Sequence, residues 1–270
     1  MINKTAITLI FKQYPVLLPD AMKVFSVCNK NEVDALELYT LINADPVLTA
    51  ISYGLYHEFF PVVQKEFFGI PHIITVLGVN TVKNFILGAV QRRLASPELN
   101  INLTLHKNFL RHSLSTAIIS YMLARERGVN DCELKEYYCA GLLHRLGDFI
   151  ISDGSGAEFN VPRKSISRED AGMLAAEIWG FPLAPAVSVS YLRNSEYDRT
   201  SGSIFAINAA LADYMAAEWE RAACPRTFNM HEIHEFFTRL NLPENIFEKI
   251  KTPLMAEFRK MEIFLGLEAA

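Results

Sequence analysis

The sequence lacks the charge bias, the long apolar runs and the cysteine pairs that mark several common protein classes. Its 26 Lys and Arg against 30 Asp and Glu leave a formal net charge of -4, which does not indicate a nucleic-acid-binding surface. No apolar run approaches the roughly 20 residues that a membrane-spanning helix requires, and the N-terminal stretch lacks a secretory arrangement. The four cysteines form no CxxC pair, as expected of reduced thiols. We therefore expect a cytoplasmic protein that binds neither nucleic acid nor membrane.

Strand patterns are also scarce, whereas helical periodicity and helix-capping signals recur along the chain. Half of the 270 residues are hydrophobic, which is enough for a substantial core. The expected caps share a polar side chain just before an apolar periodic run: Asp45 before Pro46, Asn130 with Glu133, and Ser167 with Asp170. These signals predict an all-α protein.

The helical signals fall into consecutive parts of the chain. We predict an N-terminal helical lobe over residues 1–100, a second lobe over 101–225, and a C-terminal helical extension over 226–270 in which Pro253 breaks a helix or begins one. The segment 152–167, rich in Gly, Ser and Pro, is expected to be irregular. No Gly-rich phosphate loop and no Ser-His-Asp order stand out.

Two histidines lie on apolar helical faces. His112 is flanked at helical spacing by Phe109, Thr116 and Ile119, and a lone histidine there is more often a core residue than a ligand. His144 is predicted in the middle of a helix within the run "GLLHRLGDF". A glycine inside a helix costs about 1 kcal/mol relative to alanine, so Gly141 indicates close approach by another helix or group.

Asp213 is the most informative acidic residue, because alanines surround it at helical spacing. An alanine face suits close packing, and an unpaired buried carboxylate costs several kcal/mol, so Asp213 needs a cation, a metal or several donors. The alternative is an exposed face in which alanine serves helix propensity. By ligand type, His112, His144 and Asp213 could form a metal site, although no local spacing requires one.

Seven segments, taken in order, resemble one family. They are "YPVLLPDAMKVF", "LINADPVLTAIS", "ITVLGVNTVKNFIL", "RHSLSTA", "AGLLHRLGDF", "EDAGMLAAEIWGFP" and "AALADYMA". Over about residues 15–220 they resemble the HDOD family, the HD-related output domain of bacterial signalling proteins. The resemblance implies a multi-helical HD-like bundle, so the HDOD domain is expected to span residues 1–225.

The resemblance also implies site residues, since HDOD domains are related to metal-dependent HD phosphohydrolases. The first metal-binding histidine of those enzymes matches His112, their His-Asp pair matches His144 and Arg145, and their late aspartate matches Asp213. Arg145 has no acceptor and stays protonated, so it adds positive charge where a carboxylate would bind the metal. At about 4–6 Å that repulsion is worth several kcal/mol in a partly buried site.

Further positions depart from the family pattern. Arg168 and the pair Tyr191-Leu192 stand where related sequences often carry histidines. Asp148 is acidic at a position that is often basic, which suggests a charge swap with Arg145. We hypothesise that Arg145 pairs with Asp148, and that it also reaches Asp213 as a counter-ion in place of a metal.

The resemblance and the substitution together predict a non-catalytic regulatory domain of bacterial signal transduction, without metal or cofactor. It would act through protein–protein interaction with a signalling partner, with a homodimer left open, or through repacking of its lobes. One alternative is a metal-dependent phosphohydrolase or phosphodiesterase that keeps activity through His112, His144 and Asp213. Another is a nucleotide-binding module without chemistry.

Overall fold

The described part of the chain is helical. The computed structural model describes residues 18–30, 32–60, 69–94, 103–148, 167–181, 186, 204–220 and 230–265. Every regular element within these residues is a helix, which confirms the predicted all-α class. Most of the segment predicted to be irregular, and the pair Tyr191-Leu192, lie outside the described residues.

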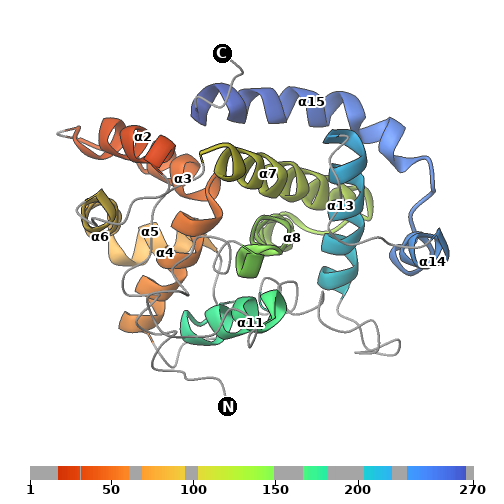
Figure 1. The fold of residues 1–270 in the computed structure, drawn as a ribbon, viewed down its shortest axis with the longest axis horizontal. Helices are drawn as coiled ribbons and strands as arrows, with labels where there is room; N and C mark the ends of the chain where they lie inside the picture. The colour runs from red at the N-terminus through yellow and green to blue at the C-terminus, as the bar shows by residue number, and fades with distance from the viewer. Residues whose placement is uncertain are drawn as a thin grey trace. The chain divides into compact units, whose positions relative to one another are not determined.

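Contacts divide the chain into two compact units, each of them discontinuous in sequence. The first contains Met1–Lys107 and Leu146–Phe181, and the second contains Asn108–Arg145 and Pro182–Ala270. The domain boundaries expected at residues 100 and 225 stay predictions. Figure 1 colours the helices in chain order, so that the members of each unit can be followed by their labels.

Among the described residues, the first unit contains five consecutive helices and one that returns from later in the chain. They are α2 (Leu18–Cys28), α3 (Ala35–Asn43), α4 (Pro46–Phe59), α5 (Ile70–Leu77), α6 (Val79–Leu94) and α11 (Arg168–Ile178). The predicted cap of α4 is present, because Asp45 Oδ1 accepts from the amides of Val47 at 2.7 Å and Leu48 at 3.0 Å. Ser167 caps α11 through the amide of Asp170.

In its described part, the second unit contains most of one long helix and four further helices. They are α7 (Leu103–Glu126), α8 (Asp131–Leu143), α13 (Ile204–Glu220), α14 (Met230–Leu240) and α15 (Ile246–Leu265). Chain reversal after α7 uses Gly128 at a φ of +78°, a left-handed conformation that favours glycine. The predicted capping box then opens α8, since Asn130 Oδ1 accepts from the amide of Glu133 at 3.1 Å.

A buried polar network connects α7, α8 and α13. Asn208 Nδ2 of α13 donates to the Ser120 carbonyl of α7 at 3.0 Å and to its hydroxyl at 2.9 Å. The same hydroxyl donates to the Tyr137 carbonyl of α8 at 2.7 Å. These bonds satisfy groups that would be costly to bury alone, and they set how the three helices pack.

Pro253 neither breaks a helix nor begins one, in contrast to the prediction. It lies inside α15, which continues from Ile246 to Leu265. The helix buries Ile250, Leu254 and Phe258, a stripe at four-residue spacing that runs past the proline. Pro253 is on the exposed side, where water can bind the backbone carbonyl that the missing N–H leaves without its helical partner.

Among the described residues, no single helix has both the length and the apolar composition of a membrane span. Only in length and composition does the bent pair Ile70–Leu77 and Val79–Val90, taken together, resemble one.

Gly141 allows α8 to approach the backbone of α7, as its place in the sequence predicts. A Cβ atom at Gly141 would lie 2.8 Å from the Thr116 carbonyl oxygen and 2.9 Å from Ala117 Cα. These are backbone atoms that can move only if the helices separate.

Gly141→Ala is therefore expected to lower the free energy of unfolding by about 1–3 kcal/mol, as overpacked cores do. Urea unfolding followed by circular dichroism measures this change. Alanine favours helices over glycine by about 1 kcal/mol, so a variant as stable as the natural protein, or more stable, would contradict close packing at this position.

Candidate functional site: a buried histidine and carboxylate cluster

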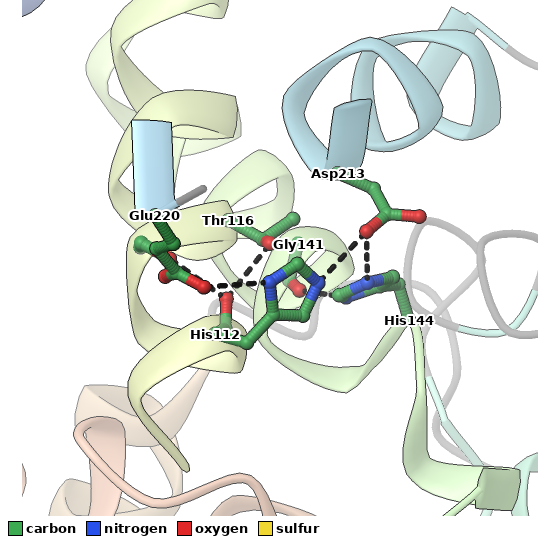
Figure 2. Close-up of polar contacts among 7 residues, drawn as sticks. His112, Thr116, Gly141, His144, Asp213 and Glu220 are labelled. Carbon is green, nitrogen blue, oxygen red and sulfur yellow. Dashed lines mark hydrogen bonds and ion pairs between the residues drawn. The ribbon is translucent and has the colours of Figure 1, made fainter. Parts of the chain in front are cut away.

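Three of the predicted site residues converge in the second unit. His112 comes from α7, His144 follows α8 directly, and Asp213 comes from α13 (Figure 2). One possible ligand atom from each residue lies within 4.8 Å of those from the other two. The three side chains are buried, with exposures of 6%, 3% and 2%. Residues separated by about a hundred positions in sequence thus form one buried polar cluster.

Asp213 is buried because its helix is packed on several sides. The alanines at positions 206, 209, 210, 216 and 217 are all buried, so the alternative of an exposed alanine face does not hold. Small side chains let neighbouring helices come close enough for their histidines to reach the carboxylate. This packing makes compensation of the Asp213 charge necessary.

His112 lies between two carboxylates. Its Nε2 is 2.8 Å from Asp213 Oδ1 and its Nδ1 is 3.2 Å from Glu220 Oε2. A carboxylate only accepts, so both ring nitrogens donate when the ring is protonated. Burial lowers the pKa of His112, but the hydrogen bonds to Asp213 and Glu220 outweigh it and raise the pKa to about 9. His112 is therefore an imidazolium at neutral pH.

Glu220 is the functional residue that sequence reasoning missed. It ends α13, seven residues after Asp213 and hence on the same helical face, and it also accepts a hydrogen bond from the Ser115 hydroxyl. The i, i+7 spacing of the two acids was the available signal. It becomes informative only once their shared partner, His112, is known.

His144 was predicted in mid-helix, and that prediction is wrong. Helix α8 ends at Leu143, and His144 and Arg145 form the turn that follows. His144 Nδ1 lies 2.6 Å from the Gly141 carbonyl oxygen, so Nδ1 carries a proton and donates it. The side chain thereby satisfies one of the carbonyls that a helix end leaves without a partner.

The other nitrogen of His144 faces the cluster. Its Nε2 lies 3.4 Å from Asp213 Oδ1, a close approach that does not meet hydrogen-bond geometry. Among the described residues this buried atom has no hydrogen-bond partner. Burial raises the pKa of Asp213, but the electrostatic interaction with the nearby His144 ring and the hydrogen bond from His112 hold it well below its usual range. Asp213 is therefore ionised.

The cluster supplies three of the donors that an HD-type metal site needs, but not the fourth. The Nε2 atoms of both histidines could face a cation, while an acceptor orients each Nδ1, as is usual for metal-binding histidines. At the fourth position, however, Arg145 offers no lone pair and carries a positive charge. His112 and Asp213 are also bonded directly to each other. The donor set therefore does not fit the four-residue metal centre.

Asp148 pairs with an arginine other than Arg145. Asp148 Oδ1 is 3.1 Å from Nε of Arg168, whose side chain is 60% exposed, and such surface pairs contribute little to stability. Arg145 is half-buried. Its proposed pairing with Asp148 or Asp213 stays a prediction.

The raised pKa of His112 makes stability depend on pH. The charged ring stabilises the fold fully below the ordinary pKa of 6.5, and this contribution disappears as pH rises through about 9. The free energy of unfolding is thus expected to fall by up to about 3 kcal/mol between these limits. Urea unfolding across this range measures the slope, with His112→Gln as the control that loses it. A slope unchanged in that variant would contradict the assignment.

Comparisons with known proteins agree with this architecture. A crystal structure of the MmoQ response regulator from Methylococcus capsulatus aligns with a TM-score of 0.63 and 17% identity over 87% of this chain and 96% of that chain. A crystal structure of a virulence factor from Campylobacter jejuni aligns with a TM-score of 0.55 and 18% identity, covering 94% and 92% of the two chains. At such identities the likeness shows the fold alone.

No curated protein matches the sequence. The family model of the HDOD domain matches residues 15–186, more than half of the sequence, and the chain therefore belongs to the HDOD family.

Proposed function

We propose that this chain is a non-catalytic regulatory domain of bacterial signal transduction. It acts in the cytoplasm through interaction with a signalling protein or through repacking of its helices. The observation that carries the proposal is the position of His112 between Asp213 and Glu220, together with Arg145 at the sequence position of the carboxylate of an HD enzyme.

The charges of the cluster support a metal-free role. The side chains of Asp213 and Glu220 flank the His112 ring, so a proton on His112 supplies positive charge that a metal would otherwise bring. A divalent cation would have to break the 2.8 Å contact between His112 and Asp213 before it could bind both. The positive charge of Arg145 next to His144 adds to this cost.

The relatives support the signalling part of the proposal. MmoQ is described as a response regulator, and its chain and this one cover each other almost fully. The buried free thiols Cys28 and Cys139 are those expected in a reducing compartment. The partner that we propose is a signalling protein or a second copy of this chain.

A metal-dependent phosphohydrolase is the second candidate, and one observation favours it. His144 Nε2 is buried without a hydrogen-bond partner among the described residues and faces Asp213, as a metal ligand would. His112, His144 and Asp213 would then hold the ion. When bound, a divalent metal supplies an activated water for phosphoester hydrolysis.

Elemental analysis of the purified chain separates the two candidates. We expect substoichiometric metal and no hydrolysis of a phosphodiester such as bis(p-nitrophenyl) phosphate with added Mn²⁺ or Mg²⁺. Stoichiometric metal together with turnover that His144→Gln abolishes would overturn the proposal.

Replacement of Arg145 tests why a metal is excluded. Arg145→Asp restores a carboxylate and is expected to bind Mn²⁺ at least about tenfold more tightly than the natural chain, as measured by titration calorimetry. Arg145→Gln is the matched control, because it removes the charge without adding a ligand. Equal Mn²⁺ affinity in all three proteins would contradict the role given to Arg145.

A further inference from the structure

We propose that the C-terminal helix α15 is a regulatory clasp on the buried cluster. It joins α7 and α13 from outside, at the residues adjacent to His112 and Glu220. The clasp rests on the proposed function in one respect, since it names how a change in the buried cluster reaches the surface of the unit. It does not depend on whether the cluster holds a proton or a metal.

Two ion pairs hold α15 along α7. Lys249, near the beginning of α15, pairs with Glu126 at the end of α7, and Glu262 pairs with Arg111 near the other end. The order of these pairs makes the two helices antiparallel, and Figure 1 shows them side by side. The Arg111 guanidinium also lies over the Phe258 ring, 5.4 Å from its centroid.

The same phenylalanine contacts α13. The ring centroids of Trp219 and Phe258 are 4.9 Å apart, in an edge-to-face arrangement at 85°. Phe258 is 4% exposed, so it is enclosed between the two helices rather than resting on their surface. Arg111, Phe258 and Trp219 thus form a continuous connection from α7 to α13.

The contacts through Phe258 lie next to the hydrogen bonds of the buried cluster. Arg111 immediately precedes His112, and Trp219 immediately precedes Glu220. Inside the unit, His112 and Ser115 bond to Glu220 across the same pair of helices. Any change in the spacing of α7 and α13 at this level therefore alters both connections together. Release of α15 loosens the cluster, and loss of the cluster loosens α15 by the same coupling free energy.

Hydrogen exchange of the full chain, followed by mass spectrometry, tests the clasp. Glu262→Gln removes its ion pair with α7, and Phe258→Leu removes the ring while keeping an apolar side chain. Glu257→Gln is the matched control, because Glu257 pairs with Lys260 inside α15 itself. Glu220→Gln tests the reverse direction. If α15 acts as a clasp, Glu262→Gln and Phe258→Leu each make exchange in α7 and α13, around His112 and Glu220, at least about fivefold faster. Glu220→Gln makes exchange in α15 faster by at least about the same factor.

The control is expected to leave α7 and α13 unchanged. Faster exchange confined to α15 in Glu262→Gln and Phe258→Leu, or the same change in Glu257→Gln, would overturn the clasp. Those results would leave the metal and hydrolysis measurements unaffected. Conversely, a metal-dependent activity would overturn the proposed function while leaving the exchange result intact.

Discussion

The hydrogen bonds of one buried histidine connect the helices on which the second unit depends. His112 on α7 bridges Asp213 and Glu220, two turns apart on α13, and Asp213 also faces His144 at the end of α8. Each carboxylate would be costly to bury alone. The positive charge of the His112 ring offsets both, so the cluster is stable only while α7 and α13 keep their present spacing.

Other features of the unit serve that spacing. Gly141 brings α8 against the α7 backbone, and the Asn208–Ser120–Tyr137 network holds the same three helices at a second level. Helix α15 then covers α7 and α13 from outside through Phe258. A regulatory domain needs an element with more than one arrangement, and the clasp that we propose for α15 would couple such an element to the polar cluster.

Much of the fold was predictable from local signals, whereas the site was predictable only in part. The Asp45, Asn130 and Ser167 caps act within a few residues, so their spacing in sequence is sufficient evidence. Glu220 could not be identified in this way, because its partner lies 108 positions away and depends on helix packing. His144 was misplaced because its apolar neighbours continue the helical period, while its own ring bonds to the Gly141 carbonyl at the helix end. Pro253 shows the opposite case, in which a buried stripe overrides a local helix breaker.

The protonation of His112 is the central claim, and nuclear magnetic resonance of the full chain labelled with ¹⁵N-histidine tests it most directly. His112→Gln assigns the ring signals by their loss. At pH 7.5 we expect both ring nitrogens of His112 to carry a proton, each with a one-bond coupling to hydrogen, in protein treated with chelator. A ring with one unprotonated nitrogen under these conditions would contradict the account.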